Sequence, residues 1–283
     1  MCPQKGPKTR RYDGFSAASL PTWQILSGVR ARRRMFPLHD DNPTEIFPLV
    51  TVLLIAACVG VWWYVQGAGL SEDALGGSIC AFGAIPAEVA GTLAAGGESP
   101  CRLGGLTWQA LFSSMFLHGS WMHLIGNMWF LWIFGNNIED SMGHLRFALF
   151  YVLTGLVASL AHVFTDPSSA IPMVGASGAI SSIMGAYLVL YPSAAVYTLF
   201  VFVFFVRVIP LPAWIMLGYW IAIQVGSSLV SPAGGGGVAY TAHIGGFLAG
   251  AGLIIVFRNP RLVAAKRGGI RLPRNEIEHR GWW

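Results

Sequence analysis

Long runs of hydrophobic residues, separated by short polar segments, dominate this chain from residue 47 to residue 256. A membrane-spanning helix needs about 20 mostly apolar residues, because it rises about 1.5 Å per residue across a hydrocarbon core about 30 Å thick. Six runs approach this length, and each is bounded by charge, Gly or Pro. They cover residues 47–65, 121–138, 145–164, 176–191, 213–229 and 242–256. The pattern predicts an all-α fold, a polytopic bundle of six transmembrane helices.

Composition supports this prediction. Hydrophobic residues make up 54% of the 283 residues and charged residues 11%, and the mean hydropathy is +0.57. These values exceed what a soluble domain of this length can bury, so a multi-spanning membrane protein is indicated.

Basic residues gather before the first run and after the last. Because Lys and Arg favour the cytoplasmic side, both termini are predicted to be cytoplasmic, which requires an even number of spans. Residues 1–40 read as a basic, disordered tail with a possible translation start at Met35, residues 41–257 as the membrane domain, and residues 258–283 as a second basic tail. This charge lies beside the membrane and not on a folded face with interleaved aromatics, so anionic lipid, and not nucleic acid, is the expected partner of the tails.

Polar residues inside the apolar runs carry the candidate chemistry, since polar groups are costly in hydrocarbon. Ser177 stands in Gly-Ala-Ser-Gly and His243 in Ala-His-Ile-Gly-Gly, which pairs a nucleophile with a base. No Asp or Glu occurs in residues 176–191 or 242–256, so a Ser-His dyad is expected and not a triad. His123 and Asn127, four residues apart, share a helical face and suit the stabilisation of an oxyanion.

The location of Ser177 and His243 constrains the topology. Both lie near the N-terminal ends of their runs, so they can meet only if these two helices are parallel, with one span between them. Residues 213–229 fill that place. The apolar stretch 196–209, which is too short to span and is followed by Pro210, is therefore interpreted as an interfacial segment, and the two catalytic candidates face the outer half of the membrane.

The order and spacing of these motifs resemble the rhomboid intramembrane serine proteases of the six-span bacterial type. The similarity covers residues 41–257 and consists of His123-x-x-x-Asn127, Gly175-x-Ser177-Gly178 and Ala242-His243-x-x-Gly246. It implies that Ser177 is the nucleophile and His243 the general base, and that His123, Asn127 and the Ser177 backbone N–H hold the oxyanion. It also implies cleavage of single-span membrane proteins in or beside their transmembrane helix, without metal or cofactor. The short architecture without further domains favours a bacterial inner membrane over an organelle.

Other polar and small residues are assigned structural roles. Glu139 is expected to tie loops together, as the family often does, and His118 is expected to be structural while contributing to a polar cavity. Close helix packing is expected from small residues at four-residue spacing. These are Ser177, Ser181 and Gly185 in one run, and Gly246 and Gly250 in another, with Gly178 beside the serine.

The chain departs from the rhomboid pattern at two positions. Ser181 stands where many rhomboids have an aromatic residue against which the histidine stacks, so a hydroxyl is expected to orient His243 instead. Gln109 follows Trp108 where the family often has Arg, in the first outer loop. Cys80 and Cys101 share that loop, and two readings stay open for them, a disulfide worth about 3 kcal/mol or a pair of reduced thiols.

Other protease classes are excluded by the sequence. A zinc metalloprotease would show His-Glu-x-x-His, and an aspartyl protease would need two Asp residues within spans; neither pattern is present. A catalytically silent rhomboid-like protein that binds transmembrane clients remains the alternative.

Overall fold

The computed structural model describes residues 34–92, 101, 104, 107–202, 205–230 and 238–268. The helices of this part are α1 (Leu49–Tyr64), α2 (Glu72–Phe82), α3 (Pro86–Ala90), α4 (Trp108–Ser113), α5 (Trp121–Phe130), α6 (Asn136–Met142), α7 (His144–Thr165), α8 (Ser177–Leu190), α9 (Ala213–Val230), α10 (Tyr240–Phe257) and α11 (Pro260–Arg267). Short helical turns are η2 (Gly67–Gly69), η3 (Ser114–Phe116) and the π-turn η4 (Leu131–Gly135). Three strands, β1 (Arg34–Asp40), β2 (Ala195–Phe202) and β3 (Phe205–Pro212), complete the fold.

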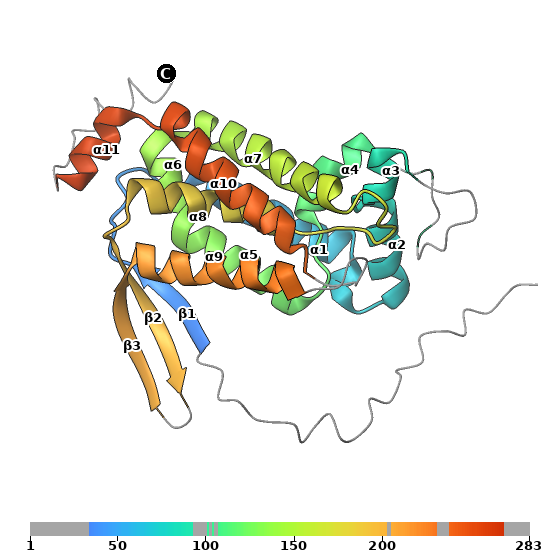
Figure 1. The fold of residues 1–283 in the computed structure, drawn as a ribbon, viewed down its shortest axis with the longest axis horizontal. Helices are drawn as coiled ribbons and strands as arrows, with labels where there is room; N and C mark the ends of the chain where they lie inside the picture. Colours follow the sequence, from blue (N-terminus) through green and yellow to red (C-terminus); the bar gives the residue numbers. More distant parts are fainter. Residues whose placement is uncertain are drawn as a thin grey trace, which may run out of the picture.

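The structure is mostly helical, as predicted, and helices occupy each of the six apolar runs. The second run is covered by α5, η4 and α6, which follow one another directly. Among the described helices, α7, α9 and α10 are long and apolar enough to cross a membrane, while α1 and α8 are apolar but shorter. In Figure 1, α2, α3 and α4 gather at one end of the helical bundle, and α11 and the sheet lie at the other, the sheet end.

The helix α8 packs closely against α10. A Cβ atom added to Gly246 would overlap the carbonyl oxygen of Gly178, and one added to Gly250 would overlap the carbonyl of Ser182. A Cβ on Gly185 would likewise meet the backbone of Phe247. Small residues therefore bring the two backbones together, as expected for Gly178, Gly185, Gly246 and Gly250, and Ser182 adds a further close approach on α8.

The three strands depart from a purely helical bundle. β2 pairs with both β1 and β3 in antiparallel register. The apolar stretch 196–209, interpreted from the sequence as a segment at the membrane interface, is thus part of a β-hairpin. Its β-branched and aromatic residues favour strands. The prediction that residues 1–40 form a disordered tail is wrong for residues 34–40, because these residues add a third strand to the hairpin; residues 1–33 lie outside the described part.

The added strand is held against α5. The ring of Phe36 lies 5.7 Å from the ring of Trp129, and the indole N–H of Trp129 donates to the carbonyl of Pro37 at 2.8 Å. A segment that looked like a tail in sequence is thus an element that connects α5 to the hairpin.

The basic C-terminal segment also folds in part. Asn259 accepts a hydrogen bond from the N–H of Arg261 and caps α11, which begins with Pro260. The guanidinium of Arg267 donates to the carbonyl of Leu190 at 2.6 and 2.8 Å and to that of Val189 at 3.1 Å, at the C-terminal end of α8. Residues 260–267 are therefore no free tail, because the charge of Arg267 caps the C-terminal end of α8. Residues 269–283 lie outside the described part.

Two buried carboxylates on α6 organise the sheet end. Glu139 is fully buried and accepts from the N–H groups of Val50 and Thr51 at 2.8 Å and from the Thr51 hydroxyl at 2.7 Å. Asp140 accepts from the N–H groups of Glu45 and Ile46 and from Lys266 at 2.8 Å. These two side chains are called the α6 carboxylates below. They fasten α1 and α11 to the rest of the bundle.

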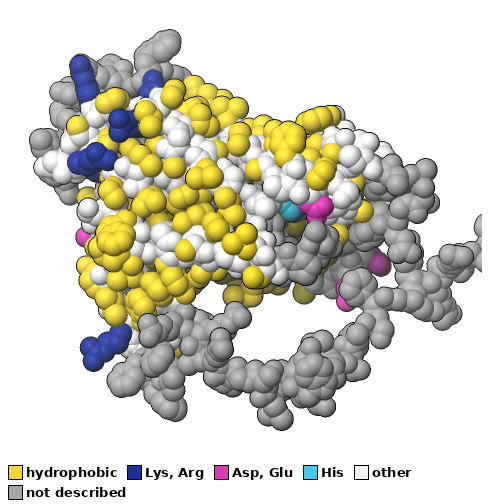
Figure 2. Space-filling view, viewed as in Figure 1, with side chains coloured by type: hydrophobic (Ala, Val, Ile, Leu, Met, Phe, Trp, Pro, Cys, Tyr) yellow, Lys and Arg dark blue, Asp and Glu magenta, His cyan; other side chains and the backbone are white. Residues whose placement is uncertain are grey.

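The surface has the distribution expected for a membrane protein. Figure 2 shows hydrophobic side chains over much of the visible face, with Lys and Arg side chains at the end where α11 and the sheet lie. Helices α9 and α10 expose large apolar residues, among them Trp214, Leu229, Leu248 and Val256. Such exposure suits a protein surrounded by lipid.

At the other end of the bundle, Cys80 of α2 forms a disulfide bond with Cys101, with a Cα–Cα distance of 5.1 Å. This bond closes part of the segment between α1 and α5.

Candidate active site

Ser177 is the first residue of α8. Two residues before it stands Gly175, which no other residue can replace without backbone strain. Gly175 has φ +127°, and its N–H donates to the carbonyl of Ser114 at 2.8 Å. A Cβ at Gly175 would lie 2.8 Å from the Nε2 atom of His123 and 3.6 Å from the hydroxyl of Ser177. The absence of a side chain at Gly175 thus leaves room for the imidazole of His123 near the Ser177 hydroxyl.

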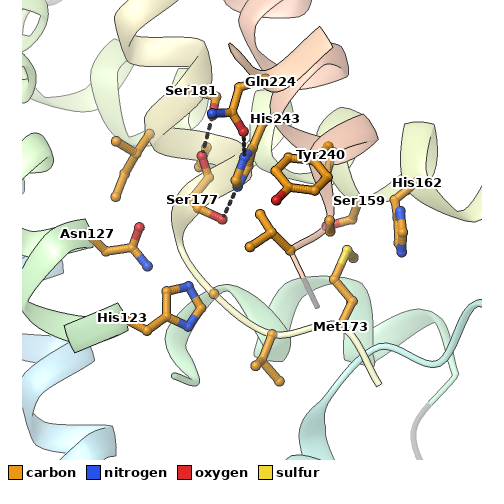
Figure 3. Close-up of a pocket in the computed structure, with 18 of the residues that line it drawn as sticks. His123, Asn127, Ser159, His162, Met173, Ser177, Ser181, Gln224, Tyr240 and His243 are labelled. Carbon is orange, nitrogen blue, oxygen red and sulfur yellow. Dashed lines mark hydrogen bonds between the residues drawn. The ribbon is translucent and has the colours of Figure 1, made fainter. Parts of the chain in front are cut away.

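His243 lies in the first turn of α10 and is 8% exposed. Its Nε2 atom is 2.8 Å from the Ser177 hydroxyl, within hydrogen-bond distance (Figure 3). The close contact of Gly178 with Gly246 brings the first turns of the two helices together and so accounts for this distance. The structure therefore joins the two residues that the sequence singled out from separate apolar runs.

The other ring nitrogen of His243 has a partner that the sequence reasoning missed. Its Nδ1 atom lies 2.7 Å from the side-chain oxygen of Gln224, which is in α9 and is 8% exposed (Figure 3). An amide oxygen only accepts, so Nδ1 carries the proton and Nε2 is left to accept from the Ser177 hydroxyl. The direct partner of His243 at Nδ1 is thus the amide of Gln224 and not the hydroxyl that was expected.

Ser181 has a different role from the one expected. Its hydroxyl donates to the carbonyl oxygen of Ser177 at 2.7 Å, one turn back along α8. An aromatic ring does lie near the histidine, but it comes from α9: the Trp220 ring is 5.8 Å from the His243 ring, tilted by 38°. The available sequence signal was a Trp and a Gln four residues apart in a mostly apolar run.

His123 and Asn127 lie on the side of Ser177 away from Gln224 (Figure 3). The N–H of Gly119 donates to the Nδ1 atom of His123 at 3.3 Å, so the proton of a neutral imidazole is on Nε2, which faces Gly175. Asn127 is 7% exposed, and its side-chain NH₂ has no protein partner within the described part of the chain. Two donors are therefore available beside the serine.

The backbone supplies a further donor. Because Ser177 is the first residue of α8, its N–H has no acceptor within the helix, and Ala176 before it provides no side-chain cap. A helix N-terminus also favours negative charge.

His118 does not contribute to the cavity, and this part of the expectation is wrong. The residue is fully buried, and its backbone N–H and C=O both bond to the side chain of Gln66 at 2.8 Å. Its ring packs edge-on against that of His123 at 5.2 Å. The polar backbone of the loop before α5 is thereby satisfied, which leaves the His118 ring behind the cavity wall.

A cavity of about 770 Å³ lies over the serine. Helices α5 and α9 form facing walls, with Met122, Gly126 and Phe130 on one and Ile223 and Ser227 on the other. The segment leading to Ser177 and the first turn of α10 complete it. The volume is in the range that holds small ligands or a few residues of a peptide.

Glu139 does not line this cavity. Its partners are the N-terminus of α1 and the partly exposed ring of His144. In the described part of the chain, no group of three or more His, Cys, Asp or Glu side chains is placed to hold a metal ion.

Comparison with known proteins gives the following relatives. Residues 105–260, more than half of the chain, match the Rhomboid domain. The chain is 33% identical to a putative rhomboid protease, YdcA of Bacillus subtilis, over 29% of this chain and 40% of that protein. It is 30% identical to Rhomboid protein 1, mitochondrial, of Saccharomyces cerevisiae, over 50% of this chain and 39% of that protein.

A third relative carries a name that bears on catalysis. The chain is 28% identical to Inactive RHOMBOID-like protein 8 of Arabidopsis thaliana, over 61% of this chain and 50% of that protein. In each of these three relatives the aligned segment spans half of the protein or less. The Rhomboid domain match, together with the apolar helices, shows that this membrane protein belongs to the rhomboid family.

Proposed function

We propose that this protein is an intramembrane serine endopeptidase that cleaves membrane-anchored proteins in or next to their transmembrane helix. One observation carries the proposal: the Ser177 hydroxyl lies 2.8 Å from the Nε2 atom of His243 at the base of a cavity. A nucleophile within hydrogen-bond reach of a base, with donors beside it, is the arrangement that acyl transfer requires.

The proposed reaction has two stages. His243 takes the proton of Ser177 while the oxygen attacks a peptide carbonyl, and the charge that develops on the carbonyl oxygen is stabilised by the Ser177 N–H, His123 and Asn127. His243 then gives the proton to the leaving amine, and a water molecule, activated in the same way, releases the acyl group from the serine.

The proposed substrates are single-span transmembrane proteins, and the entrance is lateral. Helices α5 and α9 form the two walls of the cavity and expose apolar residues on their outer sides, for example Ile125 and Tyr219. A client helix can therefore approach through lipid. A peptide bond must leave its helix before a nucleophile reaches it, so Gly, Ser or Pro in the client favours cleavage.

We further propose six spans, with the sheet end on the cytoplasmic side of a bacterial inner membrane and Ser177 toward the outer half. The basic residues of α11 and the excess of Lys and Arg near both chain ends support this orientation. The 14 residues of α8 are only about 20 Å long, so a serine at its first residue lies below the membrane surface. Anionic lipids are the proposed partners of the basic ends.

The decisive experiment is cleavage of a single-span reporter by the purified protein in detergent, with Ser177→Ala and His243→Ala as matched variants. We expect product from the wild type alone, and labelling of the wild type by a fluorophosphonate probe that the Ser177→Ala variant lacks.

The alternative function is that of a protein that binds transmembrane clients without catalysis. The relative that is named inactive supports this alternative. Silence of a folded wild type toward both the reporter and the probe, with retained binding of the client helix, would establish that alternative instead.

A further inference from the structure

We infer that Gln224 and Trp220 of α9 are positioning residues for His243, so that the histidine is oriented by a helix that carries neither member of the dyad. This inference rests on the proposed function. Gln224 acts on the reaction through the histidine and does not touch the reacting atoms.

The contact between Gln224 and His243 specifies the proton positions on the ring. The Gln224 oxygen is 2.7 Å from Nδ1, and the Ser177 hydroxyl is 2.8 Å from Nε2. Because an amide oxygen cannot donate, only the tautomer with the proton on Nδ1 satisfies both contacts, and this is the tautomer whose Nε2 can act as a base toward serine. Without an acceptor at Nδ1, the proton is free to reside on Nε2, where it blocks that role.

The contact is also secluded. Gln224 and His243 are each 8% exposed, although α9 as a whole displays large apolar residues at its surface. A buried polar side chain on a mostly apolar helix needs a partner, and the partner of the Gln224 oxygen is the ring nitrogen. The side-chain oxygen of Gln224 therefore bonds to His243, the proposed base, and not to a group within α9.

Trp220 precedes Gln224 by one helical turn on the same face. Its ring lies 5.8 Å from that of His243 and 6.2 Å from that of Phe247, one turn further along α10. The two side chains fix different degrees of freedom: the indole restricts the tilt of the imidazole, and the amide fixes its rotation and tautomer.

A neutral amide suits this location. A carboxylate at the same position would hold the Nδ1 proton more strongly, but a charge is costly inside a membrane protein. The amide provides the acceptor without that cost, at the expense of a weaker stabilisation of the imidazolium that forms during the reaction.

The test compares three substitutions of Gln224 in the full-length protein with a control on the same helix. Gln224→Met keeps the length of the side chain and removes the acceptor, and Gln224→Leu serves as a second variant without one. Gln224→Glu restores an acceptor as a carboxylate. Val225→Ala, at an exposed neighbouring position outside the cavity lining, is the control.

For Gln224→Met we expect kcat to fall by about 10- to 100-fold, with KM changed less than about 3-fold and the melting temperature close to that of the wild type. For Gln224→Glu we expect recovery of most of the kcat, with the acidic limb of the pH–rate profile moved to higher pH, because a carboxylate holds the protonated histidine. Val225→Ala should match the wild type in both constants.

The outcomes separate the inference from the function on which it rests. An active wild type whose kcat and pH profile are unchanged in Gln224→Met and Gln224→Leu overturns the positioning role alone. Equal loss in the Met and Glu variants shows a packing role and also overturns it. A folded wild type that neither cleaves the reporter nor reacts with the fluorophosphonate overturns the proposed function and, with it, this inference.

Discussion

At its first residue α8 presents a hydroxyl to a cavity, whereas at its last residues its carbonyl groups accept hydrogen bonds from Arg267. The contrast extends to the neighbouring residues. Near Ser177, the NH₂ group of Asn127 is buried without a protein partner among the described residues, and the N–H at the start of the helix is uncapped. Near Leu190, a buried ion pair joins Lys266 to Asp140.

This difference shows how the fold divides its tasks. Unpaired donors cost free energy in a buried place, so their presence at one end favours an acceptor that arrives with a substrate. At the opposite end, the α6 carboxylates accept from backbone N–H groups of residues 45–51 and from Lys266, and these bonds, together with those of Arg267, anchor α1, α8 and α11. The hydrogen bonds that anchor the helices are thus concentrated at the sheet end, where no reaction is proposed. At the end of α8 that carries Ser177, here called the site end, the reactive groups face the cavity.

The largest effect is expected from removing an α6 carboxylate. Glu139→Ala leaves the two N–H groups and the hydroxyl that it accepts from, at Val50 and Thr51, without a partner, and each such loss costs about 1–3 kcal/mol. We expect a total loss of at least about 3 kcal/mol, or roughly 6–12 °C in melting temperature measured in detergent.

The matched control for this change is His144→Ala. His144 contacts the same carboxylate but is 44% exposed, so its removal should lower the melting temperature by only a small fraction of that amount. A melting temperature of Glu139→Ala close to that of the wild type would contradict the supporting role assigned to the sheet end.

The second prediction sharpens the comparison from the site end. Asn127→Ala removes a donor that has no partner in the ground state, so stability should be unchanged or slightly higher. If the donor stabilises the oxyanion, kcat should fall by about 100-fold or more. Reporter cleavage and a thermal melt of the same sample measure both quantities. A variant that keeps its kcat would exclude Asn127 from the oxyanion site.

The smallest effect is expected from Asp40, at the end of β1. Burial raises the pKa of its carboxyl group to about 6 from an ordinary value of 3.8, and Tyr187 and Asn137 donate to it. The folded protein therefore holds this proton more tightly than the unfolded chain. Its contribution favours folding at low pH and is lost as pH rises from about 4 to about 6.

Asp40→Asn keeps an oxygen that accepts from Tyr187 and Asn137 but does not titrate. We expect the variant to melt at a higher temperature than the wild type at pH 7.5 and to lose this advantage at pH 4.5. An equal difference at both pH values would show that the substitution acts through packing and not through the proton.

The parts of this structure that were predictable follow from the cost of burying polar groups. Ser177, His243, His123 and Asn127 stand out because each is polar within an apolar run, and apolar runs of membrane length also locate the helices. Gln224 has the same property. A polar residue in an apolar run does not by itself name its partner, however, and the partner of Gln224 lies 19 residues further along the chain.

Contacts between distant parts of the chain were not predictable. Nothing in residues 34–40 indicates that Phe36 will pair with Leu199, since strand pairing depends on a partner more than 150 residues away. In the sequence, Lys266 and Arg267 indicate only the side of the membrane, whereas in the structure they bond to Asp140 and Leu190. Charge counting indicates a side of the membrane but names no partner.

The side chain of Asn137 joins the beginning of the described chain to its end, because its NH₂ group donates to Asp40 and its oxygen accepts from Lys266, each at 2.8 Å. A ribosome adds about 5–20 residues per second, and Lys266 follows Asn137 by 129 residues. Lys266, the second partner of the Asn137 amide, is therefore synthesised several seconds or more after Asn137. The helices α7, α8, α9 and α10 are synthesised in this interval. The docking of α11 on Asn137 thus comes after the synthesis of both Ser177 and His243.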